Sequence, residues 1–426
     1  MIARVSTLNE LMAALDAGER DIQLTTTVVS PHAISLPAGT RLSGDGPGVV
    51  LSFASGGLCL GPDTTVEGLT LVAPAADRAI QLLAGYRELG TIVLRDLTVS
   101  GQVAMIARLG TMSGRIEADN VHVATCDARA HNEQPQKYGV NVLQGAFTVY
   151  NFNSDPNSRL TATLTRISVG RAQAPVLGSG VFVSGFSDTG GRIDVDELTC
   201  GSVHSTGLLT FGTADFITGG VFVLAGAHVA KLECTAECET YGVNDMVLDN
   251  WGTVDSWVCR GPIRSWGPSG IGFVNFGTVD TFVAEDVVET HGLGARGFNQ
   301  YDGTVSDIRF RSITTFGDGS IGIQVSKPVG RITIDTDLVT HGGEGPSLVK
   351  GVIMDLPAIG FSVKPGGSVA TLEVGGNIMT HGDGITAVSV EGGAIEAMDI
   401  GGSVLAEGAD AELVELLDGG SAPIST

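Results

Sequence analysis

Positive charge is scarce in this sequence. Lys and Arg together number 24, against 47 Asp and Glu, which gives a formal net charge of −23 over 426 residues. This balance repels phosphate backbones and anionic lipid surfaces, so nucleic acid and membranes are unfavourable partners. A densely carboxylated or sulfated substrate would need a local basic groove, whereas a neutral glycan fits the composition more easily.

Long apolar runs and paired cysteines are also lacking. No stretch of 18 uninterrupted apolar residues occurs, and the opening MIARVSTLNELMAALDAG has no basic segment followed by an apolar core. We therefore expect a soluble chain, with the cytoplasm favoured over export and secretion left open for a chain whose leader has been removed. Most of the six cysteines stand in β-like apolar contexts, which predicts buried free thiols. Cys234 and Cys238 have no second ligand pair at zinc spacing, so we predict no metal site.

What the sequence does contain is a repeat. Thr or Ser, an aromatic ring and Gly recur at steps of 25 residues, as in Thr240-Tyr241-Gly242 and Ser265-Trp266-Gly267. The next turn after Thr340 is Thr380, 40 residues on, which is one period with a 15-residue insertion. Between the turns the sequence alternates polar and apolar residues in short pieces, and this pattern is typical of strands.

Strands and glycine turns that repeat at this length, without a helical stripe, predict a stack of parallel β coils. Like positions would lie above one another about 4.8 Å apart. We therefore expect an amide ladder and, beside it, an aromatic stack, formed by Asn250, Asn275 and Gln300 and by Trp251, Phe276 and Tyr301. The turn column accepts any flat ring, so we interpret its histidines as stacking residues rather than ligands or acid–base groups. That column contains Tyr241, Trp266, His291, Phe316, His341 and His381.

The two ends of the chain differ from the repeat. Residues 6–17 are predicted to form a short amphipathic helix, and Thr7 and Glu10 have the spacing of a capping box. Such a helix would cover the open end of a solenoid. We thus divide the chain into an N-terminal helical cap (1–20), a parallel β-helix (21–408) and a C-terminal cap or tail (409–426), in which Ala411–Leu417 would cover the other end.

A helical cap followed by LPAGTRLSGDGPGVVLSF (Leu36 to Phe53) and glycine-punctuated coils resembles the pectate-lyase-like right-handed parallel β-helix superfamily. The resemblance spans nearly the whole chain at the level of fold. It implies an all-β, right-handed parallel β-helix and a polysaccharide as the substrate class. It transfers no catalytic residue, because the sequence contains no polygalacturonase NTD with a GHG, no epimerase DPH and no lyase RxPxxR.

Insertions into regular coils are the places where a solenoid can build a site. The segments 126–137, 213–218 and 343–358 all follow the turn corner, so we expect them to lie over one face. A further loop, 151–158, would wall the other side. The outward positions of the adjacent strand would form an exposed sugar-binding strip, with Asp245 and Arg296 along its edge. By phase, that strip contains Asn141, Phe182, Phe222, Asp249, Val274, Asn299, Gln324, Ser362 and Thr386.

The strip also supplies candidate catalytic carboxylates. Glycosidic bond hydrolysis needs two carboxyl groups roughly 5 to 9.5 Å apart. Asp245 and Asp249 would be on the order of 13 Å apart along one strand. Asp215, in the inserted loop of the preceding coil, is the better partner for Asp249. One of the two would be the general acid and the other the nucleophile or base.

Three functions compete. The leading hypothesis is an enzyme that cleaves or rearranges glycosidic bonds of a neutral or weakly charged polysaccharide, as a hydrolase or an intramolecular glycosyl or fructosyl transferase. The first alternative is a uronan lyase or epimerase, which would add Ca²⁺ or Arg and a base drawn from scattered residues. The second is a non-catalytic tailspike-like or adhesive protein. Positive mean hydropathy for so exposed a fold predicts a homo-oligomer, with a trimer among its forms. The scattered bases are Lys137, Lys327, Lys350, Lys364 and Arg296.

Overall fold

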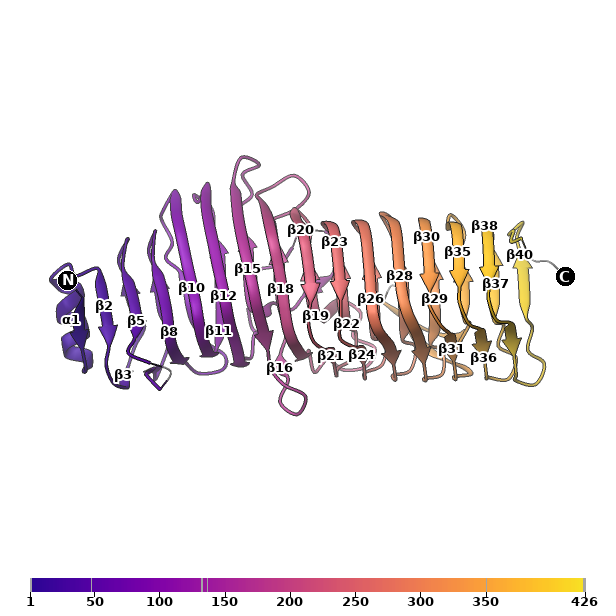
Figure 1. Ribbon diagram of the computed structural model, residues 1–426, viewed down its shortest axis with the longest axis horizontal. Coiled ribbons are helices and arrows are strands. Elements are labelled where there is room, and N and C mark those ends of the chain that lie inside the picture. Colours follow the sequence, from indigo (N-terminus) through magenta and orange to yellow (C-terminus); the bar gives the residue numbers. More distant parts are fainter. Residues whose placement is uncertain (1, 47, 132, 136, 350, 424–426) are drawn as a thin grey trace. The chain divides into compact units, whose positions relative to one another are not determined.

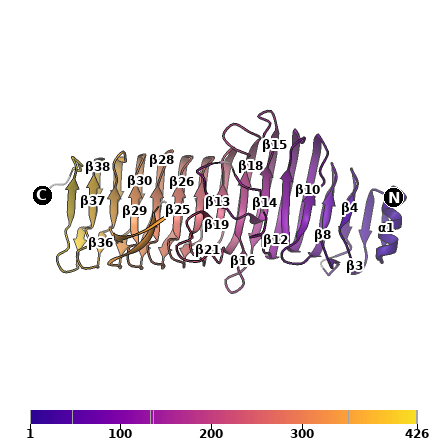
Figure 2. The ribbon, with the colours of Figure 1, turned by 180° about the vertical axis from the view of Figure 1, so that it is seen from behind.

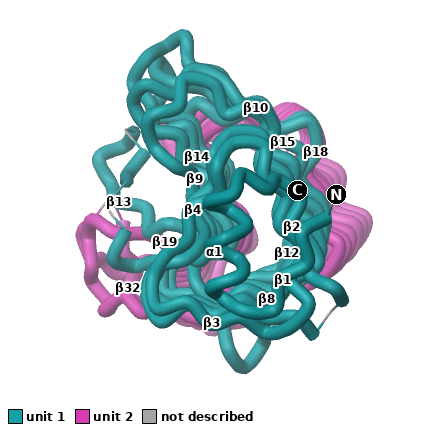
Figure 3. The backbone as a smooth tube through the Cα atoms, turned by 90° about the vertical axis from the view of Figure 1, so that its left-hand side faces the viewer, with its two compact units in different colours: residues 1–204, 222–230 teal, residues 205–221, 231–426 magenta. Residues whose placement is uncertain are grey.

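A computed structural model describes residues 2–46, 48–131, 133–135, 137–349 and 351–423. The described chain is nearly all β, and its strands form long parallel sheets, as expected for a β-solenoid (Figure 1). The chain divides into two compact units, Met1–His204 with Phe222–Ala230 and Ser205–Val221 with Lys231–Thr426 (Figure 3). The division falls within β18 (Arg192–Thr206), β19 (Phe216–Val223) and β20 (Ala227–Cys234).

Unit 1 contains two parallel sheets whose inward residues form an apolar core. One sheet comprises β1 (Ala3–Val5), β2 (Asp21–Leu24), β5 (Arg41–Gly44), β8 (Thr65–Val72), β10 (Glu88–Ser100), β12 (Ser113–Thr125) and β15 (Arg159–Val169), with β3 (Val28–Ser30) and β6 (Val50–Phe53) paired beside β8. The other comprises β4 (Ile34–Leu36), β7 (Leu58–Leu60), β9 (Arg78–Leu82), β11 (Gln102–Ala107), β14 (Gly145–Asn151) and β17 (Ser179–Ser184).

The predicted N-terminal helix is confirmed. Helix α1 spans Leu8–Asp16, and its N-cap residue Thr7 accepts a hydrogen bond from the Glu10 backbone N–H. The Glu10 carboxylate in turn accepts the Ser6 N–H at 2.7 Å, one residue earlier than in an ideal capping box. Leu11 and Leu15 are buried where α1 packs on β1, β2 and β3, and Figure 3 shows the helix lying across the end of unit 1.

Unit 2 repeats the two-sheet arrangement (Figure 2). One sheet comprises β21 (Cys238–Thr240), β23 (Thr253–Cys259), β24 (Ile263–Ser265), β26 (Thr278–Thr290), β28 (Thr304–Thr315), β30 (Pro328–Ile334), β31 (Leu338–Thr340), β35 (Ser368–Val374), β36 (Ile378–Thr380), β38 (Ala394–Ile400) and β39 (Val404–Ala406). The other comprises β22 (Asp245–Asn250), β25 (Ile271–Asn275), β27 (Arg296–Gln300), β29 (Ile321–Val325), β34 (Phe361–Val363), β37 (Val388–Glu391) and β40 (Val414–Leu417). Residues 411–417 therefore contain a strand that pairs with β37 and extends the sheet.

The repeat fixes the register in unit 2. Phe273 pairs with Phe298, and Asn250 donates to Asn275 at 2.8 Å across a separation of 25 residues. Asn275 donates in turn to Gln300 at 3.0 Å, so the predicted amide ladder is confirmed. The rings beside it are in contact but tilted: Trp251 meets Phe276 edge to face, at an interplanar angle of 68°.

The turn histidines stack, as predicted. His291 lies parallel between Trp266 and Phe316, with ring centroids 4.2 and 4.6 Å away. His341 and His381 stack at 4.6 Å with an interplanar angle of 4°.

The six cysteines are free thiols, and all except Cys59 are buried. Among the described residues, no group of three or more His, Cys, Asp or Glu side chains could hold a metal ion.

We predict that the amide ladder stabilises the folded chain. Replacing Asn275 by Ala removes a donor and an acceptor from the middle of the ladder and leaves the buried amides of its two neighbours with fewer partners. We expect the free energy of unfolding to fall by about 2 to 3 kcal/mol. This is measured by unfolding the protein with denaturant while the fluorescence of unit 2 is followed. Thr281→Ala, on the surface of β26, is the matched control and should cost under about 0.5 kcal/mol. Equal effects of the two substitutions would contradict a structural role for the ladder.

Candidate functional site

The described part of unit 1 holds a polar cleft of about 720 Å³ on the outer side of β9, β11 and β14. Its floor is formed by Arg78 and Gln81 of β9 and by Arg108, which directly follows β11. One wall is the loop that follows β12, and the remaining lining comes from three short segments. The wall contributes Ala130, His131 and Glu133, and the other segments contribute Ser55, Gly56, Ala76, Asp77 and Phe152.

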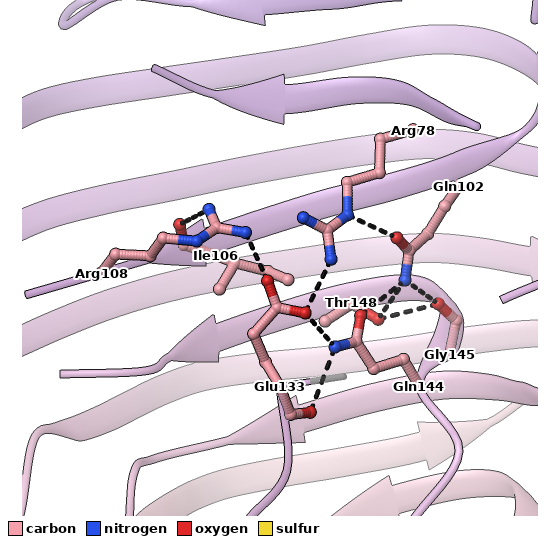
Figure 4. A network of polar contacts seen from close by, with 8 residues as sticks. All are labelled: Arg78, Gln102, Ile106, Arg108, Glu133, Gln144, Gly145 and Thr148. Carbon is pink, nitrogen blue, oxygen red and sulfur yellow. Dashed lines mark hydrogen bonds and ion pairs between the residues drawn. The ribbon is translucent and has the colours of Figure 1, made fainter. Parts of the chain in front are cut away.

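Glu133 links the loop to the sheet through two arginines (Figure 4). Its Oε2 accepts from Arg78 at 2.7 Å, and its Oε1 accepts from Arg108 at 2.5 Å. Burial acts to raise the pKa of Glu133, but the charge and hydrogen bond of Arg78, with a hydrogen bond from Gln144, lower it to about 2. Glu133 is therefore an ionised carboxylate throughout the physiological range.

A second layer of amides holds this network in place. Gln144 donates to Glu133 Oε2 at 2.7 Å, and Gln102 accepts from Arg78 Nε at 3.1 Å. Gln102 also donates to the Gln144 side chain at 3.0 Å, which orients both amides (Figure 4). The guanidinium of Arg78 is thus fixed from two sides, while Arg108 keeps 34% of its side chain exposed.

Three further groups give the cleft its chemistry. Asp77 Oδ2 accepts the Gly56 N–H at 2.7 Å, so one carboxylate oxygen is fixed by the backbone. Nε2 of His131 has no hydrogen-bond partner within the described residues, and burial lowers the pKa of His131, so its imidazole is neutral at pH 7. Phe152 packs edge to face on Tyr150 with ring centroids 5.2 Å apart, so the cleft lining includes an aromatic ring.

The predicted loop positions agree with this site. The segment 126–137 covers the outer side of unit 1's second sheet, and Phe152 from the segment 151–158 faces it. Lining residues on the two sides of the cleft come from sequence positions far apart, since Arg78 and Glu133 are 55 residues apart. The sequence did not single out Arg78, Asp77, Arg108 or Glu133.

The predicted sugar-binding strip has the expected register over part of its length. Asp249, Val274, Asn299, Gln324 and Ser362 are paired neighbours on successive strands. The next partner is Ser389 rather than Thr386, so that assignment is wrong. Asn141 lies in the two-residue strand β13 (Asn141–Val142), off the main path of the sheet, and Phe182 pairs instead with Thr148.

The predicted exposure of the strip is wrong. Phe182 and Phe222 are fully buried, and Asp249, Arg296 and Asn299 are at most 5% exposed. The phase directed these side chains outward, but tertiary packing closes their positions to solvent. Gln324 and Asn141 are half-buried.

The predicted carboxylates lie in three different environments. Asp215 is exposed, whereas Asp245 and Asp249 are completely buried. Asp245 accepts the Gly242 N–H at 2.6 Å and the Gly207 N–H at 3.3 Å, and also bonds the Thr218 hydroxyl, while burial raises its pKa to about 7. Burial raises the pKa of Asp249 well above its usual range, against an opposing contribution from the Trp251 indole.

The bases named for a uronan enzyme are dispersed. Lys137 pairs with Asp188 at 3.2 Å and Lys364 with Glu391 at 3.0 Å, while Lys327 is exposed and Arg296 is buried. Lys350 lies outside the described residues. The described helix is not long or apolar enough to cross a membrane.

No family model, curated protein or solved structure matches the chain. The fold and the cleft describe a nearly all-β chain of long parallel sheets, as expected for a β-solenoid, with a polar cleft where a loop closes over one sheet.

Because Asp249 is buried, we predict that replacing it changes the melting temperature in a pH-dependent way. The pKa of Asp249 in the folded chain lies above its value in the unfolded chain, which is about 3.9. As the pH rises, the unfolded chain therefore loses this proton first, and the free energy of unfolding decreases. Asp249→Asn removes that cost. We expect equal melting temperatures for variant and wild type at pH 4 and a variant about 3 °C or more higher at pH 8, by differential scanning calorimetry. Asp280→Asn, on the surface of β26, is the control. A variant that is less stable at pH 8 would contradict the buried, unionised carboxyl group.

Proposed function

We propose that the protein is a carbohydrate-active β-solenoid that binds a neutral or weakly charged oligosaccharide in the cleft of unit 1. The proposal rests on the lining and size of the cleft. Planar hydrogen-bonding groups and the aromatic ring of Phe152 line it, and it is large enough to hold a sugar. Its volume of about 720 Å³ lies within the range of small-molecule sites and is larger than one hexose needs. Amide, guanidinium and carboxylate groups match sugar hydroxyls, which both donate and accept.

The charge balance of the cleft favours a neutral ligand over a uronan. Both arginines already bind Glu133, and Asp77 adds a second negative charge. The lining therefore has no excess positive charge with which to neutralise a sugar carboxylate, as uronan elimination or epimerisation requires. The balanced charge of the lining therefore favours a hydrolase or transferase over a lyase or epimerase.

For reaction chemistry, the cleft offers Asp77 and Glu133 in place of the buried Asp249. Glu133 is held ionised, which suits a nucleophile or base and excludes it as the proton donor. Asp77, with one oxygen fixed by Gly56, is the candidate partner. We propose glycosidic bond hydrolysis or intramolecular glycosyl transfer by this pair, within the right-handed, 25-residue-coil β-helix that the sequence resembles.

Binding is tested by Gln81→Ala. Gln81 lines the cleft floor, and the only hydrogen bond of its side chain within the described residues is a weak one to Cys59 Sγ at 3.4 Å, so the substitution leaves the Glu133 network intact. Against a panel of fructan, β-glucan, xylan and arabinan oligosaccharides with polygalacturonate as the charged member, we expect the best neutral ligand to lose about tenfold in Kd by calorimetry. His341→Ala, in the turn column of unit 2, should leave Kd unchanged. Tighter binding of polygalacturonate than of every neutral glycan would contradict the proposal.

Catalysis is tested separately by Asp77→Asn and Glu133→Gln. We expect each to reduce turnover of the bound glycan by about 100-fold or more. Product masses distinguish hydrolysis, which adds water, from cyclising transfer, which does not, and a rise in absorbance at 235 nm would indicate elimination. Retained glycan binding with no turnover by the wild-type chain would favour the non-catalytic, adhesive alternative.

A further inference from the structure

Unit 2 contains a buried cation that no acidic side chain neutralises. Arg296, the first residue of β27, is 5% exposed, and no described Asp or Glu forms an ion pair with it. Its Nη1 donates to the Gly294 carbonyl at a long 3.4 Å, and its Nε has no partner within the described residues. Burial lowers its pKa only to about 10, so the guanidinium remains charged at neutral pH.

Such an arrangement is costly in a folded protein. An ion taken out of water without a counter-ion loses several kcal/mol of solvation, and buried charges are ordinarily paired. On the same strand, Oδ1 of Asn299 is also buried without a described partner. Among the described residues, an uncompensated guanidinium and an unpartnered amide oxygen therefore lie three residues apart on one strand.

A hairpin covers this region. Strands β32 (Glu344–Val349) and β33 (Val352–Pro357) pair only with each other, antiparallel, and join neither sheet of unit 2. Ser347 donates to the Gly294 carbonyl at 3.0 Å, the same oxygen that Arg296 contacts. The Leu348 N–H reaches Ser269 Oγ at 3.3 Å. The hairpin thus contacts the residues that directly precede β25 and β27.

The hairpin is weakly attached by comparison with the coils. The strands beneath it are joined by ladders on both sides, whereas side-chain bonds such as those of Ser347 and Ser269 fix the hairpin. Isolated two-stranded hairpins are marginally stable, and elements with few core contacts open at low free-energy cost. Its outer strand also exposes three large apolar residues, Val352, Ile353 and Met354.

We propose that the hairpin is a lid over a second ligand site, at which Arg296 binds the carboxylate of a small ligand and Asn299 hydrogen-bonds to its adjacent polar group. A carboxylate matches the planar fork of a guanidinium and supplies the missing charge. This site lies in unit 2 and does not depend on the glycan cleft of unit 1.

The repeat allows the lid to be removed cleanly. Thr315 pairs with Thr340, and Ile323 pairs with Phe361. Replacing Glu344–Pro357 by one glycine leaves as many residues between Thr340 and Phe361 as between Thr315 and Ile323. The new glycine takes the place of Gly319, whose φ of +70° disfavours other residues. The lidless coil therefore has the length of its neighbour.

The experiment titrates the full chain and the lidless variant with D-glucuronate, acetate and inorganic phosphate by calorimetry. If only molecules with an open lid bind the ligand, the apparent affinity equals the intrinsic affinity multiplied by the fraction of open molecules. We expect the lidless variant to bind D-glucuronate at least about tenfold more tightly than the wild type, and Arg296→Gln in the lidless variant to remove at least about tenfold of that affinity. Arg309→Gln, at an exposed pair with Asp335, is the control and should change nothing.

The probes distinguish the source of the carboxylate. Tighter binding of D-glucuronate than of acetate indicates a sugar acid, and equal binding indicates any small carboxylate. Tighter binding of phosphate, or affinity that Arg296→Gln leaves unchanged, overturns the proposal. For a lidless variant that does not fold, the ¹⁵Nε resonance of Arg296 in the wild-type chain provides the test: it should shift on addition of D-glucuronate, and an unmoved resonance at saturating ligand also overturns it.

Discussion

The structure depends on in-register parallel pairing, which places each residue above its equivalent in the next coil. Backbone hydrogen bonds join each strand to its equivalent in the next coil. A side-chain amide at one position can therefore bond to an amide at the same position in the next coil, as Asn250, Asn275 and Gln300 do. The same constraint explains the stacking of His291 between Trp266 and Phe316. Much of the stacking and amide hydrogen bonding of the regular columns is therefore satisfied within the columns, although the buried hydroxyls of Thr240 and Thr290 have no partner among the described residues.

Ligand chemistry is concentrated where the columns are interrupted. The loop carrying Glu133 closes over unit 1's second sheet and forms a cleft with Arg78 and Arg108, and the hairpin Glu344–Pro357 covers Arg296 in unit 2. In unit 1 the inserted loop places Glu133 against two arginines of the sheet, and in unit 2 the hairpin contacts Gly294 beside Arg296. The two sites differ in charge, since Glu133 and Asp77 balance the two arginines of the cleft while Arg296 has no acidic partner in the described chain.

The sequence was sufficient for features that depend on period. It predicted the parallel sheets, the capping helix at Thr7, the amide ladder and the loop that carries Glu133, because each follows from local spacing. The predicted insertion 213–218 instead runs into β19, which begins at Phe216. The sequence failed on burial: the phase directed Phe182 and Asp249 outward, yet both are fully buried, because burial depends on tertiary packing that has no period in the sequence. Asp77 and Arg78 were missed for the same reason, since their partners lie in distant, irregular segments. The concentration of Glu133 and His131 in the 126–137 insertion was the available signal.

The central claim is that ligand binding resides where an inserted loop closes on the sheet and not in the regular ladders. Hydrogen–deuterium exchange of the chain with and without its tightest-binding neutral oligosaccharide tests this most directly. The account predicts slower exchange in peptides covering residues 76–82 and 126–131, with peptides of the turn column from Tyr241 to His381 unchanged. Protection along that turn column, with no change at the cleft, would contradict it.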